Sequence, residues 1–569
     1  MIALQFDFNK ERTSFINPIR IIEAYTIDQV IPALRQVQDA ISNGFYAAGF
    51  LTYEAAPAFE HSMKVKDSTS MPLLWFGIFE STNEVEIKKT EGSFYISDWK
   101  PNTSRENYYQ SIRNIKEEIF HGNTYQVNYT IRMNANFKGD AFSYYQRLAE
   151  SQSANYSAFL DIGDFQILSA SPELFFHLKD QKLTTKPMKG TVGRGKTLDE
   201  DRENANWLFH SEKNRAENVM IVDLLRNDLG IIAKPGTVTV PELFSIEEYP
   251  TVYQMTSTVT CEIEEDKGIL DIFKALFPCG SITGAPKIST MNIIHELESS
   301  PRHAYCGAIG YITPNNEAIF NVPIRTVLID SNGNATYGVG GGITWDSNEL
   351  EEYDEVMTKA RVLSKSKQDI KLIETIGLKD GCLLVFENHM NRLSNSAEYF
   401  RFTCDLELIK KKTLETAQNY PVGNWKIRIL LEKDGNSSIE VIPEELIGNR
   451  NIVLAKSPIN QHDIFHYHKT TNRTIYEKCL QPFPHVFDVL LWNEAGEITE
   501  FTRGNVVVEL AGKLFTPPVT CGLLPGTYRK SLLDEGKIVE RVISVGELNK
   551  ANKIWFINSV KEWVEVQLS

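Results

Sequence analysis

A short polar stretch, Lys365-Ser366-Lys367-Gln368-Asp369, separates two parts of this chain that have their own strand and helix patterns. Before it an acid-rich helical pattern ends, and after it residues 372–375 begin a new set of strands. A length of 569 residues favours two to four domains with separate cores. Because domain boundaries fall in polar connectors, we predict one near residue 367.

Charge and cysteine usage restrict the class of protein. The net charge is −15, from 59 basic and 74 acidic residues, and no long basic run is present, so we expect no nucleic-acid partner. The seven cysteines are scattered without a CxxC pair, which favours reduced thiols in the cytoplasm and no zinc site. No leader pattern or membrane-length apolar run occurs, so we predict a cytoplasmic protein without membrane contact.

The first part mixes strand and helix signals. Residues 1–100 carry short apolar runs between turn formers, which predict strands around one or two helices. Ser104 is a typical N-cap residue for a helix over 108–120, which Gly122 ends. Helical spacing also predicts helices at 212–229, 269–276 and 286–297, and apolar runs predict strands at 165–168 and 174–178.

Lys189 is the first candidate for chemistry. It lies in Pro187-Met188-Lys189-Gly190-Thr191, about a hundred residues before a second motif, PCGSITGAPK at 278–287. An amine attacks carbon only when it is deprotonated, so a desolvated lysine with a lowered pKa can be a nucleophile. A lysine considered alone is usually a solvated surface charge.

Acidic residues near a glycine cluster form the second candidate. Glu352 and Glu355 are three apart on a predicted helix, so both carboxylates lie on one face, and Glu217 lies on another helix. Glycines at 338 and 340–342 let backbone approach a ligand closely. Convergent carboxylates suit Mg²⁺, which prefers oxygen ligands. The alternative is a solvated acidic helix face.

These motifs together resemble a known family. SPE at 171–173, KPMKGT at 186–191, RAENVMIVDLLRNDLG at 215–230, PCGSITGAPK, YCGAIGY at 305–311, PIR at 323–325 and GGGITWDSNELEEYDE at 340–355 resemble the chorismate-utilising enzymes over about residues 100–362. Anthranilate synthases of this pattern have alanine where Lys189 stands, whereas aminodeoxychorismate synthases have lysine. The resemblance therefore favours the latter group.

The resemblance implies roles for individual residues. Glu217 and Glu355 would hold Mg²⁺, with Glu352 in its outer shell, and the metal would bind the ring carboxylate of chorismate. Lys189 would attack ring carbon 2 and expel the C4 hydroxyl, with Glu173 as general acid, before ammonia enters at C4. The enolpyruvyl carboxylate and nearby oxygens would be held by Ser281, Tyr305, Arg325, the Gly342 backbone and Lys359.

Two positions depart from the family pattern, and one function is missing. Gln254 stands where many relatives have histidine, and Asn214 where many have an acid. The chain has no Gly-x-Cys-x-Gly motif of a glutaminase nucleophile. We therefore expect ammonia to come from a separate glutamine amidotransferase subunit.

The second part has its own ordered motifs. They are NHMNRL at 388–393, which opens a helix to about residue 400, YHKTTNR at 467–473, GEITEFTRGNV at 496–506 and GLLPGTYR at 522–529. Pyridoxal phosphate needs a lysine for its aldehyde, an acid for its ring nitrogen, and cationic or backbone donors for its phosphate. Each motif alone is also compatible with an ordinary helix start or turn.

Their order resembles class IV, branched-chain-type aminotransferases, a family that includes aminodeoxychorismate lyase, over about residues 372–563. The resemblance implies that Lys469 binds the cofactor aldehyde and Glu500 pairs with the ring nitrogen. Arg392 and the backbone amides of Arg503, Gly504 and Thr527 would bind its phosphate. Tyr528 replaces a threonine common in the family, and the usual hairpin before residue 372 is missing, so we expect an abbreviated small subdomain near Thr375.

The two resemblances predict an α+β fold: a large chorismate-binding domain of antiparallel sheets with flanking helices, then a smaller class IV α+β domain. Residues 1–100 would form the N-terminal part of the first fold, 101–366 its catalytic domain, and 367–569 the lyase domain. Because class IV relatives form dimers, the resemblance also implies a homodimer through this last domain. Lys469 would then remove the C4 proton, and loss of pyruvate would give 4-aminobenzoate, the folate precursor. The alternatives are an anthranilate- or isochorismate-type synthase, a branched-chain or D-amino-acid transaminase, and a regulatory protein with degenerate sites.

Overall fold

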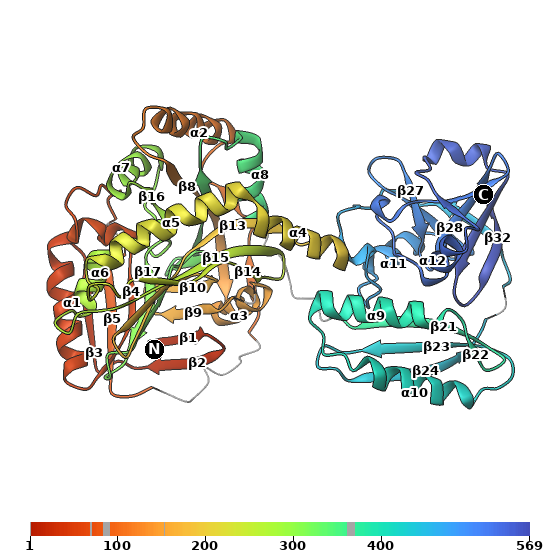
Figure 1. Cartoon of the computed structure of the whole chain (residues 1–569), viewed down its shortest axis with the longest axis horizontal. Coiled ribbons are helices and arrows are strands. Elements are labelled where there is room, and N and C mark those ends of the chain that lie inside the picture. Colours follow the sequence, from red (N-terminus) through yellow and green to blue (C-terminus); the bar gives the residue numbers. More distant parts are fainter. Residues whose placement is uncertain are drawn as a thin grey trace. The chain divides into compact units, whose positions relative to one another are not determined.

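The computed structural model describes residues 2–68, 71–82, 92–152, 154–360, 363, 370–445 and 447–569. The predicted boundary near residue 367 lies outside these residues. The chain forms two compact units, Met1–Gly193 with Asn204–Lys367, and Arg194–Glu203 with Gln368–Ser569. Figure 1 labels most of the helices and many of the strands of each unit.

Two large antiparallel sheets make up the first unit. Among the described residues each sheet has ten strands. The first sheet contains β1 Ala3–Phe8, β2 Glu11–Ile16, β6 Phe94–Ile96, β7 Lys100–Pro101, β8 Gln126–Gly139, β9 Tyr156–Asp161, β10 Phe165–Ser171, β16 Gly284–Ala285, β19 Thr326–Asp330 and β20 Asn334–Ile343. The second contains β3 Arg20–Ala24, β4 Tyr46–Leu51, β5 Leu74–Phe79, β11 Leu174–Lys179, β12 Lys182–Lys186, β13 Met188–Gly193, β14 Thr239–Glu248, β15 Val252–Glu262, β17 Ala308–Ile312 and β18 Ala318–Asn321.

The core of the first unit lies between and outside these sheets. Phe6 of the first sheet packs in one cluster with Phe50 and Trp75 of the second, so apolar faces of the two sheets meet. Separate clusters join each sheet to its own helices, as expected for strands that are apolar on both faces. These helices are α1 Ile27–Ser42, α2 Arg105–Phe120, α3 Ala141–Gln152, α5 Glu212–Gly230, α6 Ile269–Leu276, α7 Lys287–Leu297 and α8 Glu349–Ala360, with the 3-10 turns η1 Tyr53–Ala58 and η2 Gly280–Ile282.

The local sequence signals explain several boundaries. Ser104 caps α2 by accepting a hydrogen bond from the Asn107 amide, and Ser211 caps α5 in the same way through Asn214. Pro286 is the residue before α7, so this helix begins one residue later than predicted. We did not predict α3 or α4 Leu198–His210, although α4 begins with three acids, a helix-start signal that the sequence offered.

The second unit contains a small four-stranded sheet of β21 Leu372–Lys379, β22 Cys382–Leu383, β23 Asn424–Leu431 and β24 Ser437–Pro443. One face of this sheet packs its apolar residues against α9 Phe386–Phe400 and α10 Leu406–Gln418. Because side chains alternate along a strand, the residues between them point to the other face. The predicted helix opening at Asn388 in fact starts two residues earlier, at Phe386.

A second sheet of this unit mixes parallel and antiparallel pairs. Within the described residues it has eight strands: β25 Asn451–Leu454, β26 Asp488–Trp492, β27 Ile498–Phe501, β28 Asn505–Leu510, β29 Lys513–Thr516, β30 Val539–Glu540, β31 Lys553–Asn558 and β32 Glu562–Leu568. The helical segments around it are η4 Ile464–His466, α11 Thr474–Leu480, η5 Val519–Cys521, α12 Thr527–Asp534 and η6 Val545–Lys550. Both units therefore combine helices with largely antiparallel sheets.

Candidate active sites

The first candidate site is a cavity of about 380 Å³ in the first unit. Every residue that the sequence predicted for the chorismate site lines it: Glu173, Lys189, Glu217, Ser281, Tyr305, Arg325, Gly342, Glu352, Glu355 and Lys359. The two departures, Asn214 and Gln254, line it as well. Segments far apart in the sequence thus converge on one space.

A bulge in β13 directs Lys189 into this cavity. The pairing of β13 with β15 shifts register between Met188 and Thr191, and Gly190 adopts a φ of +96° that favours glycine. The Lys189 carbonyl accepts a hydrogen bond from the Asn218 amide on α5, at 3.4 Å. The bulge and this hydrogen bond therefore both fix the backbone of Lys189.

Lys189 and Glu173 have pKa values shifted in opposite directions. Desolvation lowers the pKa of the Lys189 amine, although Glu217 and Glu173 oppose this shift. Burial raises the pKa of Glu173 to about 7, against a 2.6 Å hydrogen bond that its carboxylate accepts from the Ser281 hydroxyl. The lowered pKa favours the neutral amine that a nucleophile requires, and the raised pKa favours the protonated carboxyl that a general acid requires.

Buried ion pairs hold the segment that carries Ser281. Glu298 pairs with Arg302 at 2.7 Å and with Arg132 at 3.0 Å, and all three side chains are almost fully buried. Arg302 also donates to the carbonyl of Ile282, the residue after Ser281, at 2.8 Å. Because an unpaired charge here would be costly, this network fixes the backbone beside Ser281.

The predicted metal carboxylates line the cavity but are partly engaged by other groups. The Ser347 hydroxyl donates to Glu352 at 2.6 Å, and the Lys359 ammonium contacts Glu355 at 2.6 Å, which lowers the pKa of Glu355. No three histidine, cysteine, aspartate or glutamate side chains among the described residues form a ready metal cage. A complete protein cage is not required, because Mg²⁺ usually takes one or two carboxylates and retains water.

Glycine backbone leaves room for a ligand beside these carboxylates. A Cβ placed at Gly341 would lie 3.4 Å from an oxygen of Glu352 and 4.0 Å from an oxygen of Glu355, so the two carboxylates converge over bare backbone. Burial raises the pKa of Glu217, and the charge of Glu355 raises it further. A divalent cation would relieve this repulsion, so the oxygen donors fit Mg²⁺.

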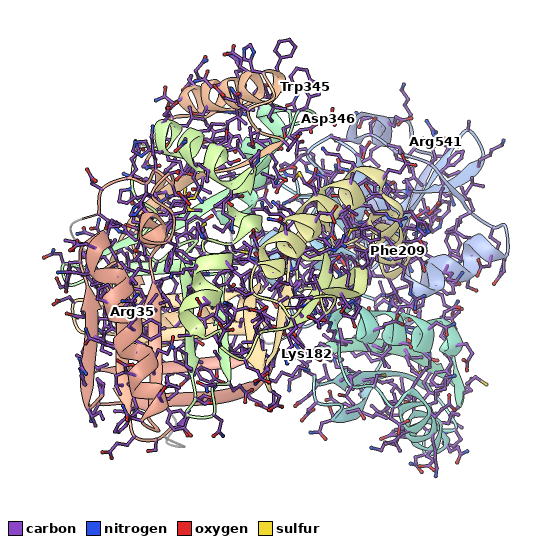
Figure 2. The ribbon with its side chains drawn as sticks, turned by 60° about the vertical axis from the view of Figure 1, so that its left-hand side comes forward. Arg35, Lys182, Phe209, Trp345, Asp346 and Arg541 are labelled. Carbon is purple, nitrogen blue, oxygen red and sulfur yellow. The ribbon has the colours of Figure 1, made fainter. Side chains whose placement is uncertain are left out.

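Sequence reasoning missed residues that line this cavity and one that lies near Lys189. Thr344 and Ser347 line the cavity. Trp345 between them is exposed (Figure 2). Its ring stacks on Phe120 at the end of α2. A Cβ at Gly342 would clash with the Gln126 amide nitrogen and lie 3.0 Å from the Lys189 amine, so Gln126 is close to this lysine. No sequence pattern distinguishes Gln126 from an ordinary strand residue.

The second candidate site is a cavity of about 330 Å³ in the second unit. Every residue predicted to bind the cofactor lines it: Arg392, Lys469, Glu500, Arg503, Gly504 and Thr527. Thr375 of β21, which the missing hairpin left without an expected role, lines it too. The carbonyl of Lys469 accepts a hydrogen bond from the Ile373 amide at 2.9 Å, which ties the lysine to β21.

Lys469 has a strongly lowered pKa. Desolvation is the largest cause, the charges of Arg473 and Arg392 add to it, and the pKa falls to about 7. Burial raises the pKa of Glu500 to about 7, while the Tyr476 hydroxyl donates to its carboxylate at 2.8 Å. A cationic nitrogen beside Glu500 would favour its ionised form, as a pyridinium requires.

Glu374 holds Arg392, one of the residues predicted to bind the cofactor phosphate. We did not predict Glu374 itself as a site residue. Arg392 donates to Glu374 through two nitrogens at 2.9 and 2.7 Å, and His389 contacts it at 2.6 Å. The other nitrogen of His389 lies 3.0 Å from the Thr527 hydroxyl at the start of α12. Glu374 was the one charged residue in the apolar run 372–376, a signal that the sequence did contain.

These donors fit pyridoxal phosphate. A lysine amine, a buried acid and an arginine beside a helix N-terminus border one cavity, which supplies groups for the aldehyde, the ring nitrogen and the phosphate. Gly526 before α12 leaves no room for a Cβ, which would clash with Asn505. Glycine is therefore required at this position, which lines the cavity at the start of α12.

Comparison with known proteins agrees with this division. Residues 3–365 match the family model of the chorismate binding enzymes, and residues 371–568 match that of amino-transferase class IV. The chain therefore belongs to the chorismate binding enzymes and carries a class IV aminotransferase domain. This confirms the two predicted resemblances and the α+β fold class.

The similar proteins include aminodeoxychorismate synthases and an anthranilate synthase. The chain is 43% identical to aminodeoxychorismate synthase component 1 of Salmonella typhimurium over 263 residues, which is 46% of this chain and 58% of that protein. It is 36% identical to the Klebsiella aerogenes protein of the same name, over 55% of this chain and 75% of that one. Anthranilate synthase component I of Streptococcus pneumoniae is similar in structure, with a TM-score of 0.55 and 26% identity over 61% of this chain and 91% of that one.

The chain spans less than two thirds of the length of the Salmonella and Escherichia coli relatives, 58% and 59%. No helix in the described part of the chain is both long and apolar enough to span a membrane.

Proposed function

We propose that this chain makes 4-aminobenzoate from chorismate and ammonia in two steps, one at each cavity. The observation that carries the proposal is that each cavity presents a lysine with a lowered pKa beside a buried acid, Glu173 or Glu500, with a pKa of about 7. Similarity to aminodeoxychorismate synthases supports the first step. The class IV aminotransferase match supports the second.

In the first step the neutral Lys189 amine forms a bond to ring carbon 2 of chorismate. The two ring double bonds shift, and the C4 hydroxyl leaves as water after it takes a proton from Glu173. Ammonia then bonds to C4, the double bonds shift back, and the bond from carbon 2 to Lys189 breaks. Chorismate and ammonia thus give aminodeoxychorismate and water, with Lys189 and Glu173 restored.

Cationic and polar groups would hold the dianionic substrate during this step. Arg325, Tyr305, Ser281, Lys359 and the Gly342 backbone border the cavity and suit the enolpyruvyl carboxylate and its neighbouring oxygens. Glu217, Glu352 and Glu355 would hold Mg²⁺, which supplies positive charge for the ring carboxylate.

In the second step Lys469 moves the proton from C4 of aminodeoxychorismate. The bond from C3 to the enolpyruvyl oxygen then breaks, the released enolpyruvate takes up a proton to become pyruvate, and the ring becomes aromatic. Pyridoxal phosphate, when bound, supplies an electron sink for the C4 carbanion. Glu500 would orient the ring nitrogen of the cofactor and keep it protonated. The cofactor phosphate would be held by Arg392, Thr527 and the backbone at Arg503 and Gly504.

Ammonia requires a source, and we propose a separate glutamine amidotransferase subunit. We also expect a homodimer through the class IV domain. Glutamine should support turnover only when such a subunit is added, and light scattering of the full chain checks the dimer.

Product identification tests the proposal. The pure chain is incubated with chorismate, ammonium and Mg²⁺, with and without pyridoxal phosphate. We expect aminodeoxychorismate without the cofactor, and 4-aminobenzoate with an equal amount of pyruvate when it is present. Anthranilate or isochorismate as the product, or 2-oxoglutarate-dependent amino transfer without 4-aminobenzoate, would favour the alternatives and overturn the proposal.

A further inference from the structure

The cavity that contains Lys469 is bordered on one side by the small sheet of the second unit. Thr375 of β21 pairs with Arg428 of β23, and both residues line the cavity together with Ile373 and Lys426. The alternate residues, such as Ile427 and Ile429, lie in the core with α9 and α10. Strand alternation therefore directs Arg428 to the cavity face of the sheet.

Most cations around this cavity are committed to other groups. Arg392 is held by Glu374, Arg473 by the Thr502 carbonyl, and Arg503 by Asp488. Lys426 lies 3.8 Å from Glu445, and Lys561 donates to the Glu445 carbonyl at 2.9 Å.

Arg428 differs from these cations. The structure gives its guanidinium no hydrogen bond or ion pair with any described residue, and its side chain is exposed at the border of the cavity. A guanidinium in this state can bind a carboxylate through two parallel hydrogen bonds without breaking an existing pair.

The chemistry of the second step places a carboxylate far from the reacting amine. In 4-aminobenzoate and in its precursor the ring carboxylate is attached opposite the C4 amine. When the amine end lies at Lys469, the carboxylate end must therefore lie away from this lysine, toward the rim of the cavity. Glu444 and Glu445 also line this cavity and would repel the carboxylate. A cation without a partner is therefore needed to bind it.

We propose that Arg428 binds the ring carboxylate of the lyase substrate and so selects ligands that carry a carboxylate opposite the reacting amine. This inference rests on the proposed function of the second unit. It assigns Arg428 to substrate binding, while Lys469 moves the proton.

Steady-state kinetics of Arg428→Gln in the full, cofactor-loaded chain test the role. With aminodeoxychorismate supplied directly and pyruvate release measured, we expect KM to rise about 10- to 100-fold, as for loss of one charge-assisted pair, with kcat changed less than about threefold. Arg428→Lys should recover part of the loss, because the charge remains without the fork geometry. Lys412→Gln, an exposed cation on α10 away from the cavity, is the matched control and should leave KM unchanged.

A binding comparison separates this inference from the function on which it rests. The wild-type chain should bind 4-aminobenzoate more tightly than aniline, and Arg428→Gln should bind the two alike. An unchanged KM and an unchanged preference in Arg428→Gln would overturn the role of Arg428. Absence of pyruvate release from both the wild type and Lys412→Gln would instead overturn the proposed lyase function, and the carboxylate preference would still decide the role of Arg428.

Discussion

Lys189 and Lys469 both have amines that desolvation makes less basic, but the largest charge effects on their pKa values are opposite in sign. At Lys189 the largest charge effects come from Glu217 and Glu173, which oppose the lowering of its pKa. At Lys469 they come from Arg473 and Arg392, which add to the lowering, while Glu374 and Glu500 oppose it. The difference matches the expected ligands, because the first cavity would share its carboxylates with a metal cation and the second would share its cations with a phosphate.

Exchange of each lysine for alanine should have the largest effect, and a different one in each cavity. Lys189→Ala should slow aminodeoxychorismate formation by at least about 10³-fold, because the nucleophile is removed, while the second step on supplied aminodeoxychorismate continues. Lys469→Ala should show the reverse pattern and accumulate aminodeoxychorismate. Chromatographic product analysis measures both, and full turnover of Lys189→Ala would refute the covalent first step.

The buried acids should separate the two cavities by their reactions. Glu173→Gln should slow the first step by about 10²- to 10⁴-fold, because a general acid is lost. Wild-type turnover of this step, measured at a fixed concentration of free ammonia, should fall as pH rises through about 7, where Glu173 loses its proton. An unchanged rate in Glu173→Gln would exclude this role, and Glu500→Gln serves as the control that should affect only the second step.

The buried ion pairs of the two units should differ in what their loss affects. Burial opposes ionisation of Glu374, but the charges of Arg392 and His389 prevail and lower its pKa to about 2. We expect these charges to stabilise the fold by about 3 kcal/mol above pH 4.5, and this stabilisation to be lost as pH falls toward 2. Glu374→Gln should lower the free energy of unfolding of the second unit by about this amount. The cofactor should then be released at a lower guanidinium concentration than in the wild type.

Glu298→Gln is the counterpart in the first unit. It should destabilise that unit by about 3–5 kcal/mol, because Arg302 and Arg132 would be left as buried unpaired charges. Cofactor release should stay as in the wild type. If Glu298→Gln also released the cofactor at a lower guanidinium concentration, this network would not act on the first site alone.

The smallest expected effect concerns the contribution of Arg473 to the lowered pKa of Lys469. Arg473→Gln removes one of the charges that lower the pKa of Lys469, so this pKa should rise. The rate of pyridoxal phosphate uptake by the cofactor-free chain should then reach its plateau at higher pH, and uptake at pH 7 should slow by about tenfold for each unit of pKa. An unchanged pH profile would mean that desolvation alone sets the basicity of Lys469.

Much of the site was predictable because its residues belong to ordered motifs. Lys189, Glu173, Glu217 and Ser281 come from separate motifs, and they line one cavity as the resemblance implied. Helical spacing and caps also predicted α2, α5 and α6 closely, since apolar periodicity is a local signal.

What could not be predicted depends on pairing between distant strands. Nothing local in the sequence shows that Thr375 lies opposite Arg428, because the register of β21 with β23 is a tertiary property. The same holds for Gln126, which reaches Lys189 only through the approach of β8 to Gly342 in β20. Glu374 is different, because a lone acid within an apolar strand already indicated a buried ion pair.

Two lysines should act in turn on chorismate and on the product of the first step, and complementation between two inactive variants can show this. Lys189→Ala and Lys469→Ala are each incubated with chorismate, ammonium, Mg²⁺ and pyridoxal phosphate, alone and as a mixture. We predict that neither chain alone forms 4-aminobenzoate and that the mixture forms it with an equal amount of pyruvate. Formation of 4-aminobenzoate by either variant alone, or none in the mixture, would contradict the account.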